Sequence, residues 1–401
     1  MTVEHRTHVV VGAGALGTAA AYWLSRRGAH DVLVLEQFEL GHGRGASEDH
    51  SRIIRHAYHA PEYAALTRAA YAAWAEVEAE TGLPLVTVTG GLDLAADGTA
   101  GETTLANYRA AMRAEGHEFE ELTAAEIRRR FPQWRIDDDV RGLFQAEGGI
   151  LDIRKAGAGH VALARARGVE FRASTTVTGL ASTADGVRLE TDRGPVRAEN
   201  VVLAVASWLP HLREDLGLPW EMTLSQEQVG YFAGPHLARF APDRFPMFVF
   251  HGGGGPGEDR VHYGFPVFGE PAVKVARDMS GRFIRSEERS YDPDPAETAL
   301  LRRFLERHLP DAVGPELLSK TCVYDMTPDR DFVIDRVPGH PRVLALLGAG
   351  HAGKFAGLIG QIAADLSLEG RTEHPIGAFA FDRPALTDPG FVPTFRLNGE
   401  H

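Results

Sequence analysis

Cysteine, lysine and long apolar runs are all scarce in this 401-residue chain. The single cysteine, Cys322, excludes an internal disulfide framework and any zinc or iron–sulfur site built from several cysteines, and it is typical of a reducing compartment. The apolar N-terminal stretch is interrupted by Tyr22, Ser25 and Arg26, well short of the roughly 20 apolar residues that a membrane span requires. We therefore expect a cytoplasmic protein with no signal peptide and no membrane partner.

Positive charge is also in deficit. The chain has 42 Lys and Arg against 55 Asp and Glu, a formal net charge of −13. This charge repels phosphate backbones and disfavours a nucleic-acid partner. The histidines show no metal-ligand spacing such as HExxH, so no metal site is predicted. The length exceeds the usual single-domain ceiling of roughly 250 residues, which predicts two domains.

Only four of the 42 basic residues are lysines, which leaves 42 − 4 = 38 arginines. A solvated surface accepts either residue, whereas a compact, titratable ammonium requires lysine. A GC-rich genome gives the same bias, so scarcity alone assigns no role. The four positions are Lys155, Lys274, Lys320 and Lys354.

The N-terminus has the pattern of a dinucleotide-binding βαβ unit. A β-branched run from Thr7 to Val11 leads into the Gly-Ala-Gly-Ala-Leu-Gly turn at 12–17 and an Ala-rich helical stretch to about Arg27. A second apolar run, 31–35, ends at Glu36, 19 residues after the last glycine of the turn. This order of strand, glycine turn, helix and acidic residue is typical of a nucleotide-binding fold.

Each glycine of the turn has its own physical task. Gly12 permits the tight turn, Gly14 lets the backbone approach a pyrophosphate, and Gly17 allows the helix to pack closely on the strand. Glu36 is placed to accept hydrogen bonds from a ribose hydroxyl and would repel a 2′-phosphate, which disfavours NADP. The turn alone leaves NAD and FAD both open.

The sequence pattern of a dinucleotide-binding domain returns at 169–205 and at 343–368, and strand-like and Pro-rich segments lie between these ranges. We therefore predict a mixed α/β (α+β) chain with a discontinuous Rossmann-like cofactor domain and a mainly antiparallel-sheet substrate domain. The predicted boundaries are 1–85, 142–216 and 320–385 for the cofactor domain, 86–141 and 217–319 for the substrate domain, and 386–401 for a C-terminal tail.

Six motifs occur in the order that is known in one family. They are the GAGALG turn, SRIIRHAY at 51–58, YGFP at 263–266 with Lys274, CVY at 322–324, DFVID at 331–335, and Gly350-His351 with Lys354-Phe355. In these motifs the chain resembles monomeric sarcosine oxidase and N-methyltryptophan oxidase, over essentially its whole length. The resemblance implies an FAD cofactor, a monomer, a small amino acid substrate and O₂ as the electron acceptor.

Cys322 resembles the family's cysteine that carries FAD through a thioether to the flavin 8α-methyl group. Without the resemblance, a lone cysteine is most simply a small buried hydrophobe. The resemblance also places Ser51 and Gly350 in the cofactor site. A covalent substituent would alter the electronics of the ring that accepts the electrons.

Lys274 resembles the family's oxygen-activating lysine. Reduction of O₂ by a reduced flavin begins with transfer of one electron, and a nearby ammonium stabilises the negative charge that develops. The residues alone also allow Lys274 to be a solvated strand residue.

Arg55 and Lys354 are similar to the family's clamp for the substrate carboxylate, and Arg52 to the arginine beside the flavin. If their segment is helical, the two arginines share one face; surface salt bridges are the alternative for both. Lys354 begins a helix, where positive potential would also stabilise a reduced flavin. Tyr263 and Tyr324 occupy substrate-facing catalytic positions, although core packing would account for them as well.

Two positions depart from the family pattern. Paired histidines usually precede the arginine motif, where this chain has Ser47-Glu48, and a histidine usually follows the lysine, where this chain has Asp278. Glu48 and Asp278 are therefore predicted to line the substrate site. Acids at these positions put sarcosine itself in doubt and favour a substrate with an additional amine or hydrogen-bond donor.

The sequence thus predicts an FAD-dependent oxidase of a secondary amine in an N-alkyl or cyclic amino acid, such as sarcosine, N-methyltryptophan or pipecolate. Hydride transfer to flavin N5 would be followed by imine hydrolysis and formation of H₂O₂. The alternatives are a flavin-dependent amino acid dehydrogenase, a tailoring oxidase of a biosynthetic pathway, and a noncatalytic flavin-binding subunit.

Overall fold

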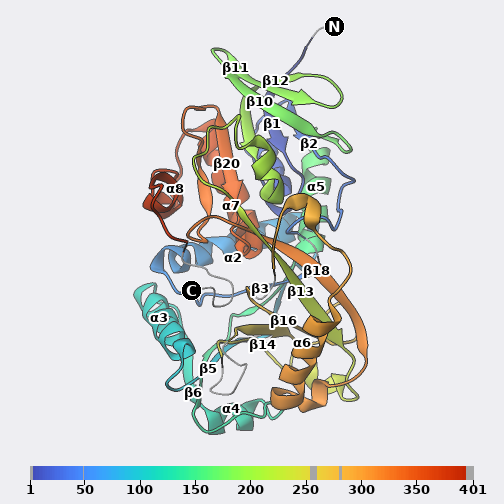
Figure 1. Cartoon of the computed structure of the whole chain (residues 1–401), viewed down its shortest axis with the longest axis vertical. Coiled ribbons are helices and arrows are strands. Elements are labelled where there is room, and N and C mark those ends of the chain that lie inside the picture. Colours follow the sequence, from blue (N-terminus) through green and yellow to red (C-terminus); the bar gives the residue numbers. More distant parts are fainter. Residues whose placement is uncertain (1–2, 48, 253–259, 280–281, 394–401) are drawn as a thin grey trace.

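The computed structural model describes residues 3–47, 49–252, 260–279 and 282–393. Two large sheets lie at opposite ends of the long axis, and a small sheet lies between them (Figure 1). The predicted mixed α/β fold class, with a Rossmann-like sheet and a mainly antiparallel second sheet, is confirmed.

The first sheet has eight strands, and its centre is parallel. The parallel strands follow the order β20-β12-β1-β2-β9, and β10, β11 and β19 add antiparallel pairings. β1 is buried along its second half because helices cover it, as expected for a parallel sheet. The strands are β1 (Glu4–Val11), β2 (Val32–Leu35), β9 (Glu170–Arg172), β10 (Val177–Thr183), β11 (Gly186–Thr191), β12 (Val196–Leu203), β19 (Val333–Arg336) and β20 (Val343–Leu347).

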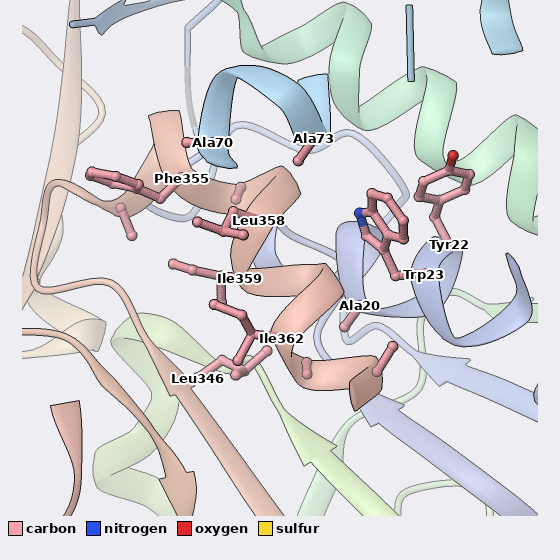
Figure 2. Close-up of a cluster of buried hydrophobic side chains, with 14 of the residues drawn as sticks. Ala20, Tyr22, Trp23, Ala70, Ala73, Leu346, Phe355, Leu358, Ile359 and Ile362 are labelled. Carbon is pink, nitrogen blue, oxygen red and sulfur yellow. The ribbon is translucent and has the colours of Figure 1, made fainter. Parts of the chain in front are cut away.

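Helices α1 (Ala15–Arg26), α2 (Pro61–Thr81), α5 (Ile153–Ala166) and α7 (Ala356–Leu368) form the core beside this sheet. Figure 2 shows Trp23 of α1, Ala73 of α2 and Leu358 of α7 in one apolar cluster. A Cβ on Gly360 would lie 2.5 Å from the carbonyl carbon of Ala19, so glycine permits the close contact of α7 with α1. Within the described ranges, no helix combines the length and the apolar content of a membrane span.

The second sheet has nine strands in the order β17-β13-β16-β15-β14-β5-β7-β6, with β18 beside β13. The pairing of β14 with β5 is parallel, and its other described pairings are antiparallel. The strands are β5 (Gly91–Ala96), β6 (Glu120–Thr123), β7 (Val140–Gln145), β13 (Thr223–Phe232), β14 (Met247–Phe250), β15 (His262–Phe265), β16 (Val273–Arg277), β17 (Arg282–Ile284) and β18 (Glu316–Met326). Helices α3 (Ala100–Ala114), α4 (Ala124–Arg130) and α6 (Pro295–His308) accompany it (Figure 1).

The small sheet joins β3 (Ser51–Ile54), β8 (Gly149–Asp152) and β4 (Val86–Val88). The arginine motif therefore begins in a strand. Arg52 and Arg55 do not lie in a helix, so they do not share a helix face. Strands β7 and β18 belong to the nine-stranded sheet although the predicted boundaries at 142 and 320 cross them. The domain boundaries stay a prediction.

Candidate active site

The glycine turn between β1 and α1 has the geometry that a dinucleotide requires. Gly12 has a φ of +97°, and a Cβ there would lie 2.5 Å from the carbonyl oxygen of Ala204. A Cβ on Gly17 would lie 1.9 Å from the carbonyl oxygen of Gly12. Both positions exclude larger residues, and Gly14 is the N-cap of α1, so the turn leads to a helix N-terminus, whose dipole favours a phosphate.

Glu36 lies at the end of β2 and is buried. Its carboxylate accepts backbone N–H groups from Ala13 at 2.8 Å and Phe38 at 2.9 Å, and His42 Nε2 lies 3.2 Å away. Burial opposes ionisation, but these hydrogen bonds hold the pKa of Glu36 below its ordinary value. An ionised acceptor therefore lies beside the turn, as recognition of a ribose requires.

Two cavities meet at this turn. One, of about 960 Å³, follows the turn, Glu36 and Trp208. The other, of about 720 Å³, lies between the sheets and is lined by Arg52, Lys274 and Cys322. Gly14, Ala15 and Ser47 are among the residues that line both. The residues present therefore fit an extended dinucleotide: those of the first cavity would hold its adenosine end, and those of the second would hold its other end.

Lys274 lies on β16 and is buried in the wall of the second cavity. Its Nζ lies 2.7 Å from Asp49 Oδ2 and donates to Ser51 Oγ at 2.9 Å. The ammonium also lies 4.7 Å from the centre of the Phe265 ring. Burial lowers the pKa of Lys274, and the charge of Asp49 opposes that shift.

Cys322, on β18, faces the same cavity. Burial and the nearby Glu227 raise the pKa of its thiol to about 12, while Arg52 and Lys274 act in the opposite direction. The thiol is therefore protonated at neutral pH.

Tyr324 lies two residues after Cys322 and packs against Gly350, where a Cβ would lie 2.7 Å from the Tyr324 Cβ. Tyr263, on β15, shares a hydrogen bond with Tyr324.

Arg52 and Arg55 both line the second cavity and have different partners. Arg52 donates to the backbone carbonyls of Ser51 at 2.9 Å and Ala46 at 3.1 Å. Arg55 forms an ion pair with Asp93, which is fully buried on β5. Although burial opposes its charge, Asp93 raises the pKa of Arg55 above its ordinary value.

The Arg55–Asp93 pair leaves polar atoms without a described partner. Arg55 donates to the Tyr108 hydroxyl at 3.1 Å, and His251 Nε2 lies 3.0 Å from Asp93 Oδ1. In the described part of the chain, Arg55 Nε, Asp93 Oδ2 and the Tyr58 hydroxyl are buried and have no hydrogen-bond partner. Such atoms are those that a polar ligand in the cavity would satisfy.

Lys354 projects from the 3₁₀ turn Ala352–Phe355 that precedes α7. Its Nζ lies 5.4 Å from the Tyr58 ring centre, and no carboxylate of the described residues lies within 4 Å of it. Burial, together with Arg55 and Arg330, lowers the pKa of Lys354 to about 7. It is thus a half-buried amine whose charged form an anionic ligand would stabilise.

The two predicted acids differ in outcome. Asp278 lines the cavity, and both of its oxygens accept hydrogen bonds from Arg330, at 2.9 and 3.1 Å. Although burial opposes ionisation, Arg330 keeps the pKa of Asp278 below its ordinary value. Asp278 is therefore an ionised and paired group. Glu48 lies outside the described residues.

The structure brings Arg52, Arg55, Tyr263, Lys274, Asp278, Cys322, Tyr324, Gly350 and Lys354 to one cavity, together with Ser51. The sequence reasoning missed three further residues that line this cavity, Asp49, His251 and Arg330, and it missed Asp93, the ion-pair partner of Arg55. Asp93 had a signal, because it is a lone acid between Leu92 and Leu94 in an otherwise apolar strand. Asp49 lies beside the singled-out Glu48, whereas Arg330 and His251 show no local signal. The described residues contain no group of three or more His, Cys, Asp or Glu side chains that could hold a metal.

Comparison with known proteins gives consistent matches. A family model described as FAD dependent oxidoreductase matches residues 7–366. Monomeric sarcosine oxidase of Streptomyces avermitilis is 34% identical over 377 residues, which cover 92% of this chain and 96% of that protein. N-methyl-L-tryptophan oxidase of Salmonella arizonae is 31% identical over 380 residues, which cover 94% and 98%. The solved open form of NikD, an unusual amino acid oxidase essential for nikkomycin biosynthesis, is 28% identical with a TM-score of 0.83, covering 94% of this chain and 98% of that one.

These matches confirm the resemblance that the six motifs indicated. The family model spans both large sheets, and the relatives include oxidases named for sarcosine and for N-methyl-L-tryptophan. The glycine turn and the contiguous cavities agree with the cofactor in the family's description. The chain is an enzyme that belongs to the FAD dependent oxidoreductase family.

Proposed function

We propose that the protein oxidises a secondary amine in an N-alkyl or cyclic amino acid and passes the electrons to O₂. The observation that carries this proposal is that two lysines line one cavity. Lys274 is buried and has a carboxylate partner, whereas Lys354 is half-buried and has none among the described residues. One cation suits a substrate carboxylate and the other suits the charge that develops on O₂.

The overall reaction balances without a dedicated base on the protein. The amine loses a hydride from its α-carbon and a proton from nitrogen, and water hydrolyses the resulting imine. FAD, when bound, supplies the carrier that takes up two electrons from the amine and delivers them to O₂. The two electrons and two protons convert O₂ to H₂O₂.

Lys354 would hold the substrate carboxylate, and Arg55 would assist it through Nε, which has no described partner. Because Asp93 already compensates the charge of Arg55, the net positive charge comes from Lys354. The Tyr58 ring centre lies 5.8 Å from Arg55 Cζ and 5.4 Å from Lys354 Nζ, and the Tyr58 hydroxyl has no hydrogen-bond partner among the described residues. This arrangement would fix the carboxylate and thereby the α-carbon over the flavin.

Asp278 would shape specificity at the same cavity. Asp278 is ionised and can accept hydrogen bonds. Because it forms an ion pair with Arg330, the pair as a whole carries no net charge. Tyr324 and Tyr263 would exclude water from the amine on this side. A substrate with an extra hydrogen-bond donor would profit from this pair more than sarcosine, which has no further polar group.

We also propose that Cys322 carries the flavin covalently and that the protein is a monomer. The position of the thiol in the flavin end of the site supports the covalent bond. Acid precipitation of the purified protein tests it, because a covalent flavin leaves the pellet yellow and a noncovalent flavin colours the supernatant. Cys322→Ala is the control and should release its flavin.

A peroxide assay tests the activity itself. The panel comprises sarcosine, N-methyltryptophan, pipecolate and other cyclic or N-alkyl amino acids, with the matching primary amino acids as controls. The proposal expects peroxide from at least one secondary amine at a rate above that of its primary counterpart. Flavin reduction without peroxide formation would favour the dehydrogenase alternative.

A further inference from the structure

Asp49 is a buried carboxylate shared by two of the four lysines of the chain. Its Oδ2 lies 2.7 Å from Lys274 Nζ and accepts the Tyr231 hydroxyl at 2.5 Å. Its Oδ1 lies 3.4 Å from Lys320 Nζ and 3.1 Å from His50 Nδ1. The side chain of Asp49 is 4% exposed, so these contacts replace water as its solvation.

The backbone of Asp49 indicates that the side chain has a function. Its φ is +70°, a left-handed conformation that glycine adopts at the least cost and that other residues adopt rarely. Asp and Asn tolerate this conformation better than most residues do. Glycine would adopt this backbone conformation at lower cost than Asp49. Unlike glycine, Asp49 supplies the carboxylate that contacts the two lysines.

The electrostatic balance shows what the carboxylate does for Lys274. Desolvation favours the neutral amine, and Arg52 acts in the same direction, while Asp49 is the largest influence that favours the ammonium. The same pairing keeps the pKa of Asp49 well below its ordinary value in spite of burial. Without the carboxylate, Lys274 would face Lys320 and Arg52 with no described anion in contact.

We propose that Asp49 is a positioning residue that holds Lys274 charged and fixed at the wall of the cavity. Its contacts orient Nζ between Asp49 Oδ2 and Ser51 Oγ. The consequence for O₂ reduction rests on the proposed function of Lys274. The charge state of Lys274 does not rest on it and can be measured separately.

The scarcity of lysine makes that measurement practical. Protein grown on lysine labelled with ¹³C at the ε-carbon contains four labelled lysine side chains, and Lys274→Met, Lys320→Met and Lys354→Met assign three of the signals. A pH titration of the flavin-loaded protein then reports the charge of Lys274. Among the described residues, the titratable or charged groups that face Lys274 or Asp49 include Arg52, His50, Tyr231, Lys320 and Cys322.

The wild-type protein gives the first test. Lys274 is buried and Lys354 is half-buried, and of these two only Lys274 has a carboxylate partner in the described structure. The proposal expects Lys274 to keep its proton to a higher pH than Lys354. Titration of Lys274 at or below the pH of Lys354 would overturn the proposal without any variant.

Two variants remove the negative charge of residue 49, and both tolerate its left-handed backbone conformation. Asp49→Asn keeps a side chain suited to the left-handed conformation, and Asp49→Gly relieves any strain there. Both should move the titration of Lys274 to lower pH. Tyr231→Phe removes one hydrogen bond and leaves the charge in place, so it should leave that titration close to the wild type.

Kinetics give the second readout. Reoxidation of the reduced enzyme by O₂ should slow about tenfold or more in Asp49→Asn at neutral or higher pH, and should recover at low pH, where Lys274 regains its proton. An unchanged Lys274 titration in both charge-removing variants would refute the role of Asp49, even if the enzyme is an active oxidase. Normal reoxidation in Lys274→Met would instead refute the proposed role of Lys274.

Discussion

Arg55, which lines the second cavity, forms a buried ion pair with Asp93, whose side chain is fully inaccessible to solvent. The pair joins the segment after β3 to β5 of the nine-stranded sheet. It limits the net charge that Arg55 offers to a substrate carboxylate. In the proposed substrate site, Lys354, which has no carboxylate partner among the described residues, would therefore supply most of the net positive charge.

Asp93→Asn should destabilise the protein by about 3 kcal/mol, because it leaves the Arg55 charge buried without its partner. A small carboxylate that fills the cavity should restore part of this loss, since it compensates the same charge. Thermal unfolding with and without propionate measures both effects. An equal propionate shift in the variant and the wild type would contradict the assignment of Arg55 to the carboxylate site.

Binding of an anionic ligand should weaken as pH rises through about 7, the value to which burial and neighbouring arginines lower the pKa of Lys354. The sign follows from charge: Lys354 is an ammonium below that pH and a neutral amine above it. Propionate, which has no amine to titrate, is the suitable probe in a flavin-absorbance titration. Lys354→Met should bind about tenfold or more weakly below pH 7 and lose this pH dependence.

Lys274→Met should slow reoxidation of the reduced enzyme about 100-fold, because the ammonium that stabilises the developing negative charge on O₂ is lost. Flavin reduction by substrate should change far less. Rapid-mixing absorbance measures the two half-reactions separately. Equal effects on both would contradict an oxygen-specific role.

Gly17→Ala should abolish flavin loading and cost about 3 kcal/mol of stability, because the new Cβ would lie 1.9 Å from the Gly12 carbonyl oxygen. Gly377→Ala is the matched control, since nothing lies within 4 Å of its Cβ position. The flavin-to-protein absorbance ratio and the melting temperature check both variants. A Gly17→Ala protein that binds flavin and keeps the wild-type melting temperature would contradict the claim that this turn excludes a Cβ at position 17.

The sequence predicted those parts of the molecule that depend on local pattern. The strand, the glycine turn and α1 follow from periodicity and from backbone sterics, and Glu36 follows from its spacing. The ordered motifs indicated which residues share a cavity, since strands β15, β16 and β18 bring Tyr263, Lys274 and Cys322 together.

The counter-ions could not be predicted in this way. Asp93 reaches Arg55 because β5 lies beside the small sheet, and Arg330 reaches Asp278 from the loop after β18. Such pairs depend on tertiary contacts between segments that are distant in sequence. The sequence therefore indicated which charged residues lie in the site, but it did not indicate which of them form ion pairs with an opposite charge.

The most direct test of the central claim is an anaerobic titration of the yellow protein with the best secondary-amine substrate from the peroxide panel. The account predicts that one equivalent of substrate per flavin bleaches the visible band, and that admission of air restores it with one equivalent of H₂O₂. A flavin that no N-alkyl or cyclic amino acid bleaches, or that stays bleached in air, would contradict the account.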